Sequence, residues 1–197
     1  MRALSLFAGI GGFDLGLERA GFAVVGQVEI DPACRRVLAR HWPDTWRHDD
    51  VTTITGAEVR ANVGTVDLVA GGSPCQDLSV AGRRGGLAGE RSGLFHEQCR
   101  LADEFAASWL LWENVPGALS SNDGADFATV LETITGFRPA VPNDGWRNAG
   151  ACVGPKRSAA WRVLDAHIVG GCPLHVEERG RGPVPQRRRR IFVVARA

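Results

Sequence analysis

Reactive side chains follow two of the apolar stretches in this sequence, and the first of them is a cysteine. Cys75 comes after residues 66–70, two glycines and the pair Ser-Pro. Ligands collect at the carboxyl ends of the strands in open α/β sheets, so a cysteine there could act as a nucleophile. Taken alone, it could equally be a small core residue, which is the commonest fate of free cysteine.

The second reactive side chain is Glu113, which ends the apolar stretch 109–112 in the motif Glu-Asn-Val. A carboxylate beside aromatic and aliphatic residues at a strand end could donate a proton to a bound ligand. In isolation it could also be a solvated or helix-capping glutamate.

Four consecutive arginines, residues 187–190, precede the last apolar stretch. In an extended chain alternate side chains share a face, so Arg188 and Arg190 point one way and their two neighbours the other. One pair could reach a site while the other meets solvent or phosphate. A basic run by itself is more often a solvated surface.

A glycine-rich turn, Phe7-Ala-Gly-Ile-Gly-Gly, follows the first apolar stretch. A dinucleotide fingerprint requires a third small residue where this chain has Asp14, which disfavours pyrophosphate binding. Glu29 lies 20 residues after Gly9, where an acid can accept hydrogen bonds from ribose hydroxyls. Asp50 could hold an adenine amino group. These residues predict an adenosine-bearing cofactor without a pyrophosphate, and a tight turn with solvated acids is the alternative.

Apolar stretches alternate with helical patterns along the chain. A helix is expected after Asp31, which is a suitable N-cap because Pro32 follows it at the first helical position. Strands alternating with helices predict an α/β fold with a doubly wound, mostly parallel sheet. The expected strands are residues 4–8, 22–30, 66–70, 109–112 and 191–195, and the expected helices are residues 13–20, 32–41, 95–108, 125–134 and 159–168.

The composition is that of an ordinary globular domain. The chain has 197 residues, of which 44% are hydrophobic and 23% charged, with a formal net charge of +1. No apolar run reaches the ~18 residues that a membrane span needs, and no signal peptide is evident. The five cysteines form no Cys-x-x-Cys pair, which favours a reduced, cytoplasmic setting.

Five motifs occur in the sequence order of the DNA (cytosine-5)-methyltransferases: Phe-x-Gly-x-Gly-Gly, the later glutamate, Pro-Cys-Gln, Glu-Asn-Val and Gln-x-Arg-x-Arg. The chain resembles that family from Leu4 to Val194. The resemblance implies an S-adenosylmethionine-dependent (Rossmann-like) methyltransferase fold. It also implies methyl transfer from S-adenosyl-L-methionine to C5 of a cytosine flipped out of double-stranded DNA.

The resemblance assigns a role to each reactive residue. Cys75 would add covalently to cytosine C6, and Glu113 would protonate or hydrogen-bond N3. Arg188 would contact the cytosine carbonyl and steady the cysteine, and Arg190 would support the site through Glu113 or phosphate. The candidate cofactor-binding residues are Gly9, Ile10 and Gly11 of the turn together with Phe7, Glu29, Ile30, Asp50, Val51 and Pro74.

The chain also departs from the family pattern. Complete members continue into a target-recognition region, so we expect residues 1–197 to be a single catalytic domain that lacks it. The chain would be either a natural subunit that needs a second polypeptide with that region or a truncated open reading frame of a bacterium or phage. Residues 78–94, rich in glycine and arginine, are expected to be a mobile loop, and residues 169–184 an insertion loop. Cys172 and His175 lie in that insertion, but two ligands make a weak case for a metal.

Other classes of function stay open at this point. The chain could be an inactive remnant that still binds the cofactor or DNA, or one subunit of a split enzyme. An RNA methyltransferase is disfavoured because the cysteine stands in Pro-Cys-Gln, as in the DNA enzymes. An oxidoreductase with a nucleotide cofactor is disfavoured by Asp14 in the glycine-rich turn.

Overall fold

A computed structural model describes residues 1–74, 93–169 and 187–197 of the chain. Cys75, Cys172 and His175 lie outside the described residues. So do the two predicted loops, 78–94 and 169–184, except for residues 93, 94 and 169, which are helical. No helix in the described part is both long and apolar enough to cross a membrane.

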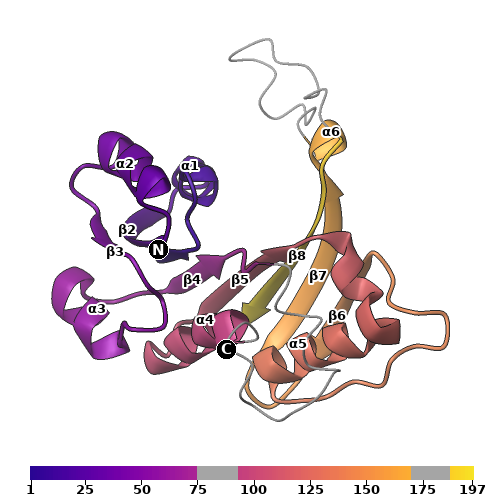
Figure 1. Cartoon of the computed structure of the whole chain (residues 1–197). Helices are drawn as coiled ribbons and strands as arrows, with labels where there is room; N and C mark the ends of the chain where they lie inside the picture. Colours follow the sequence, from indigo (N-terminus) through magenta and orange to yellow (C-terminus); the bar gives the residue numbers. More distant parts are fainter. Residues whose placement is uncertain (75–92, 170–186) are drawn as a thin grey trace.

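The core of the molecule is one sheet of eight strands in the order β3-β2-β1-β4-β5-β8-β7-β6 (Figure 1). The pairs from β3 to β5 are parallel, whereas β8, β7 and β6 continue the sheet with antiparallel pairs. The strands are β1 (Arg2–Leu6), β2 (Ala23–Val28), β3 (Trp46–His48), β4 (Leu68–Gly71), β5 (Trp109–Asn114), β6 (Ala149–Val153), β7 (Ser158–Asp165) and β8 (Arg189–Arg196).

Helices cover both faces of the parallel part of this sheet. The helices are α1 (Gly12–Arg19), α2 (Pro32–His41), α3 (Gly56–Val63), α4 (Gly93–Glu104), α5 (Ala125–Thr135) and α6 (Ala166–Val169), with short 3-10 turns η2 (Pro116–Leu119) and η3 (Ser121–Gly124). The larger core lies on the face of α3, α4 and α5, and a smaller cluster lies on the face of α1. The predicted doubly wound, mostly parallel α/β fold is therefore confirmed.

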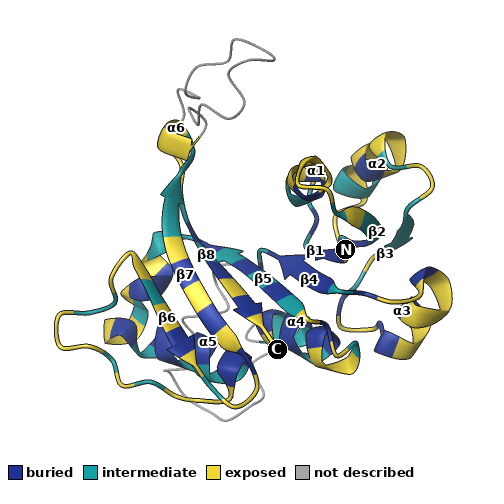
Figure 2. Ribbon diagram, turned by 180° about the vertical axis from the view of Figure 1, so that it is seen from behind, coloured by how far each residue is buried: buried dark blue, intermediate teal, exposed yellow. Residues whose placement is uncertain are grey.

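Among the described residues, helices leave one part of the sheet without cover on the α1 side. Alternate residues of β8, among them Val193, are buried against the larger core, but Phe192 and Val194 face the other way. Val194 is 41% exposed. No described helix lies over this side of β7 and β8, where exposed and buried residues alternate in full view (Figure 2).

Two local signals in the sequence explain how the N-terminal helices begin. The Asp31 side chain accepts hydrogen bonds from the N–H groups of Ala33 and Cys34, which caps α2 as predicted. Gly11 precedes α1 at φ 92°, and a Cβ there would lie 2.3 Å from the ring of Trp42. Only glycine fits that position, because both the backbone angle and the packing of α2 exclude a side chain.

Asp14 is buried inside the sheet-facing side of α1 and explains the departure from the dinucleotide pattern. Its carboxylate accepts hydrogen bonds from the Ser5 hydroxyl at 3.0 Å and from Gln27 Nε2 at 2.9 Å. Desolvation by burial raises the pKa of Asp14, although these bonds lower it. The acid therefore ties α1 to β1 and β2 where a dinucleotide-binding fold has a small residue.

The prediction of a helix over residues 159–168 was wrong. Residues 158–165 form β7, and only Ala166–Val169 is helical. Burial alternates along β7, with Ala159 and Trp161 against the core, which is the period of a strand. The strand is stabilised by antiparallel pairing with β6 and β8 on either side, and the pairing with β8 joins segments that lie far apart in the sequence. Helix α3 and strand β6 were not predicted from the sequence either.

Candidate active site at the carboxyl edge of the sheet

An ion pair between β5 and β8 forms the centre of the candidate site. Glu113 Oε1 lies 3.0 Å from Arg190 Nε, and their side chains are 20% and 24% exposed. Glu113 pairs in register with Phe192, so Arg190 stands two residues along the neighbouring strand, on the same face. The antiparallel addition of β8 thus places a cation beside the carboxylate.

A cavity of about 310 Å³ opens beside this ion pair. Phe13 of α1 contacts Phe192 of β8 edge to face, with ring centroids 6.4 Å apart, and both residues line the cavity. The cavity therefore joins the glycine-rich turn to the end of β5. Its lining residues are Phe7, Ala8, Gly12, Phe13, Gly72, Glu113, Arg188 and Phe192.

The end of β4 is tied to β5 immediately before the predicted nucleophile. The Trp112 indole N–H donates to Ser73 Oγ at 3.0 Å, and Asn114 Nδ2 donates to the Ser73 carbonyl at 3.3 Å. Pro74 is the last described residue of this segment, and Cys75 lies outside the described residues. The two bonds fix the backbone two residues ahead of the cysteine to the strand that carries Glu113.

Gly72 leaves the space that the Glu113 carboxylate occupies. A Cβ built on Gly72 would lie 2.6 Å from Glu113 Oε2. A side chain there would have to displace the carboxylate or the strand end. This role of Gly72 could not be predicted from the sequence, because a glycine in Gly-Gly-Ser-Pro is equally typical of a simple turn.

Phe7 begins the glycine-rich turn in a strained backbone conformation. Its φ is 54°, in the left-handed region that costs a bulky residue about 1–3 kcal/mol and that occurs mostly at functional sites. Ile10, in contrast, is 67% exposed. It lines a neighbouring hollow of about 370 Å³ with Trp42 and Leu15, so the turn contributes to two cavities.

Glu29 is fixed by the backbone on both sides. One carboxylate oxygen accepts the Gly9 N–H at 2.7 Å, and the other accepts the Asp31 N–H at 2.8 Å. Each oxygen keeps a second lone pair that could accept a hydroxyl. Ile30 follows with its side chain 71% exposed, an apolar surface without cover at the carboxyl end of β2.

Asp50 and Val51 follow β3 at the same edge of the sheet. Asp50 Oδ1 accepts from the Thr52 N–H at 2.9 Å and from the Thr52 hydroxyl at 2.8 Å. These hydrogen bonds lower the pKa of Asp50. The Val51 side chain is buried, so a ligand would meet it only at its margin.

The structure thus brings Phe7, Glu113 and Arg188 around one cavity, with Arg190 paired to Glu113. Parallel pairing sets the remaining cofactor candidates along the same carboxyl edge, at the ends of β1, β2, β3 and β4. Glu29 and Asp50 do not line the cavity of Glu113. The arrangement could hold a polar ring against a carboxylate and a guanidinium, with an extended ligand along the strand ends.

Comparison with known proteins gives consistent results. Residues 1–138 match the family model of C-5 cytosine-specific DNA methylases. The Type II methyltransferase M2.BsuMI of Bacillus subtilis is 32% identical over 99% of this chain. A DNA N-6-adenine-methyltransferase of Escherichia phage P1 is 34% identical over 98% of this chain.

This chain spans 42% of the length of the first of these relatives and 28% of the second. The crystal structure of the S. pombe Dnmt2 methyltransferase superposes on the whole chain with a TM-score of 0.66 at 20% sequence identity, and the match covers 50% of that protein. A likeness at this level of identity supports the fold alone.

Proposed function

Because this chain belongs to the C-5 cytosine-specific DNA methylase family, we propose that it is the catalytic part of a DNA (cytosine-5)-methyltransferase. The proposed reaction moves a methyl group from S-adenosyl-L-methionine to C5 of a cytosine flipped out of the duplex. The observation that carries this proposal is the Glu113–Arg190 pair beside the Phe7 cavity, one strand from the segment that leads into Pro-Cys-Gln.

The proposed chemistry begins with the poor nucleophilicity of cytosine C5. Addition of the Cys75 thiolate to C6 breaks the aromaticity of the ring and makes C5 enamine-like. Glu113 first takes up a proton from solvent and then donates that proton, or a hydrogen bond from it, to N3, which stabilises the electrons displaced toward the ring. After the methyl group is transferred, the C5 proton is lost to a base and the C6–S bond breaks, which releases Cys75.

Arginine completes the proposed base pocket. Arg188 lines the cavity with Glu113 and is exposed, so it is available to donate to the cytosine carbonyl. Arg190 holds the Glu113 carboxylate by its Nε atom and therefore acts on the orientation of that acid. A planar guanidinium is suited to both tasks because its N–H donors are fixed in direction.

The strand ends fit an adenosine-bearing methyl donor. Glu29 has its two oxygens oriented by backbone N–H groups and retains acceptor capacity for ribose hydroxyls. The exposed Ile30 side chain offers an apolar surface to an adenine ring. S-Adenosyl-L-methionine would supply an electrophilic methyl group on a sulfonium. Phe7 would lie between Glu113 and the strand ends that hold the cofactor.

Methylation of adenine N6 is the second candidate, since one relative with that name is 34% identical over 98% of this chain. An exocyclic amine already carries a lone pair and needs no covalent activation by a thiolate. The motif Pro-Cys-Gln favours cytosine, because a cysteine has a direct task in that reaction.

We also propose that the active enzyme contains a second polypeptide that carries the target-recognition region. The chain spans less than half of the two relatives described above. No described helix covers the side of β7 and β8 on which Val194 is exposed, and on this side Phe192 and Val194 lie among the exposed arginines Arg162 and Arg196 (Figure 2). A segment of the partner that packs there would bury it and complete the cavity wall near Phe192.

The proposal is tested by identifying the methylated base. Duplex DNA and isotopically labelled S-adenosyl-L-methionine are incubated with the chain, alone and with the product of the adjacent gene, and the nucleosides are resolved by mass spectrometry. We expect labelled 5-methylcytosine. Labelled N6-methyladenine would favour the second candidate, and transfer to neither base in both mixtures would reject a methyltransferase role.

Substitution of Gly72 by alanine is expected to move the Glu113 carboxylate and break its pair with Arg190, since the new methyl group would lie 2.6 Å from Glu113 Oε2. Misplacement of a reacting group by about 1 Å lowers turnover by about 10²-fold. Gly16→Ala is the control, because a Cβ there meets no atom within 4 Å. Steady-state methylation rates of the two variants test this prediction. Equal rates would show that turnover does not depend on the position of the Glu113 carboxylate.

A further inference from the structure

Arg35 reaches from α2 back to the segment that follows β2. Its Nη1 atom donates to the carbonyl oxygens of both Glu29 and Ile30, each at 2.8 Å. One nitrogen therefore uses both of its hydrogens on two successive peptide groups. These bonds carry the positive charge of the guanidinium, which makes them stronger than bonds between neutral groups.

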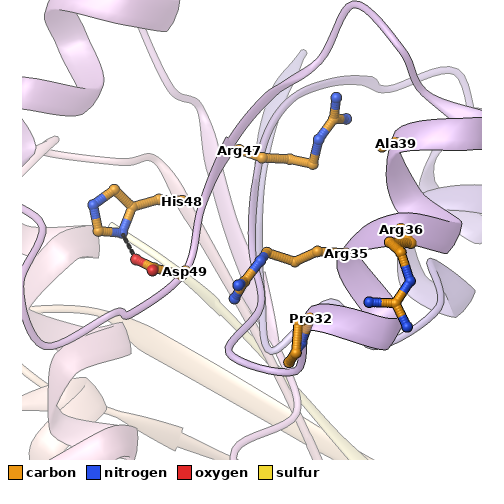
Figure 3. A pocket seen from close by; sticks show the side chains of 7 residues that line it. All are labelled: Pro32, Arg35, Arg36, Ala39, Arg47, His48 and Asp49. Carbon is orange, nitrogen blue, oxygen red and sulfur yellow. Dashed lines mark ion pairs between the residues drawn. The ribbon is translucent and has the colours of Figure 1, made fainter.

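Arg35 and its neighbour Arg36 both line a cavity of about 560 Å³ between α2 and β3 (Figure 3). Their side chains extend in different directions, and that of Arg35 runs toward the segment of His48 and Asp49. Arg36 is exposed, and its side chain makes no hydrogen bond or ion pair to any residue in the described part of the chain. The two arginines are therefore neighbours on the same helix and carry the same charge, but their side chains make different contacts.

The segment after β2 is held at several points at once. The Glu29 side chain is bound by the N–H groups of Gly9 and Asp31, and Asp31 in turn caps α2. These contacts do not involve the carbonyl oxygens of Glu29 and Ile30. Among the residues the structure describes, only the Arg35 side chain donates hydrogen bonds to these two oxygens. With the backbone held in this way, Ile30 stays 71% exposed and does not collapse onto its neighbours.

We propose that Arg35 is a positioning residue for the adenosine end of the cofactor, an inference that rests on the proposed function. It holds the backbone carbonyls of Glu29 and Ile30, and through this backbone it sets the positions in which the ligand meets the two side chains. A loop fixed before binding does not lose conformational freedom on binding, so affinity rises without any direct contact. Arg35 touches neither the base nor the transferred methyl group, so the rate at saturating cofactor should not depend on it.

The test compares Arg35→Met, Arg35→Lys and Arg36→Met in the full chain. Titration calorimetry measures the affinity of S-adenosylhomocysteine and of adenosine, and thermal unfolding measures stability. We expect Arg35→Met to bind both ligands roughly tenfold more weakly, a difference of about 1.4 kcal/mol, with an unchanged melting temperature. Arg36→Met should match the wild type, and Arg35→Lys should recover most of the affinity because an ammonium also offers several donors.

Hydrogen exchange supplies a second readout that needs no ligand. In Arg35→Met the amides of Gly9 and Asp31 should exchange faster, since Glu29 is no longer held in place. Equal affinity of Arg35→Met and wild type for both ligands would overturn the inference and leave the proposed function intact. A lowered melting temperature without rescue by lysine would assign Arg35 a structural role instead. A wild-type chain that binds neither ligand would contradict the proposed function itself.

Discussion

Replacement of Cys75 by serine is expected to reduce methyl transfer to cytosine by at least about 10⁴-fold, the range in which loss of a covalent nucleophile falls. A thiolate is available near neutral pH, whereas a serine hydroxyl stays protonated and adds poorly to C6. Cofactor affinity should be unchanged, because the substitution removes a reacting atom and no part of the adenosine site. Methylation rates and calorimetric affinity for S-adenosylhomocysteine check the two halves of this prediction.

Cys34→Ser is the matched control for that experiment. Burial and the nearby charges of Asp31 and Glu29 raise the pKa of the Cys34 thiol, and burial raises that of Cys99 to about 12. Both thiols are therefore protonated near neutral pH and unsuited to attack a ring. We expect Cys34→Ser to keep the wild-type activity and Cys75→Ser to lose it. Comparable activity in both variants would reject Cys75 as the nucleophile.

Substitution of Glu113 by glutamine is expected to lower turnover by about 10²–10⁴-fold, the contribution typical of a positioned general acid. An amide keeps the shape of the side chain but cannot transfer a proton to N3. It also removes the charge that pairs with Arg190 at 3.0 Å. Single-turnover rates with saturating DNA and cofactor separate this loss from weaker binding.

A second ion pair in the chain provides the control for Glu113. Glu132 lies 2.6 Å from Arg138 on the surface, with both side chains nearly half exposed. Such exposed pairs contribute little, so Glu132→Gln should leave the rate and the melting temperature unchanged. If Glu113→Gln retained the wild-type rate, proton donation by this carboxylate would be excluded.

Local pattern was sufficient for the parallel half of the sheet. Short apolar stretches that end in glycine or an acid, followed by helical spacing, fall on β1, β2, β4 and β5 with boundaries shifted by a few residues. The Asp31 cap and the start of α2 follow from chemistry within four residues. These features depend on contacts close in sequence, which is why one sequence reveals them.

In the antiparallel half, the apolar stretch 191–195 predicted β8, but β6 and β7 were not predicted. β7 is a strand because β6 and β8 pair with it, and β8 is separated from it by more than 20 residues. The alternation rule did anticipate that Arg188 and Arg190 share a face, and both lie at Glu113. Gly72 and Arg35 were missed because their significance depends on which atoms the fold brings against them.

The most direct test of covalent attack by Cys75 is a trap with DNA that contains 5-fluorocytosine. Fluorine cannot leave C5 as a cation, so the covalent intermediate should persist after methyl transfer. We predict that mass spectrometry of the wild-type chain, mixed with this DNA, S-adenosyl-L-methionine and any companion chain, will show a denaturant-stable species linked through the peptide that contains Cys75. Methylation of ordinary cytosine by the same mixture without any such linked species would contradict a covalent mechanism.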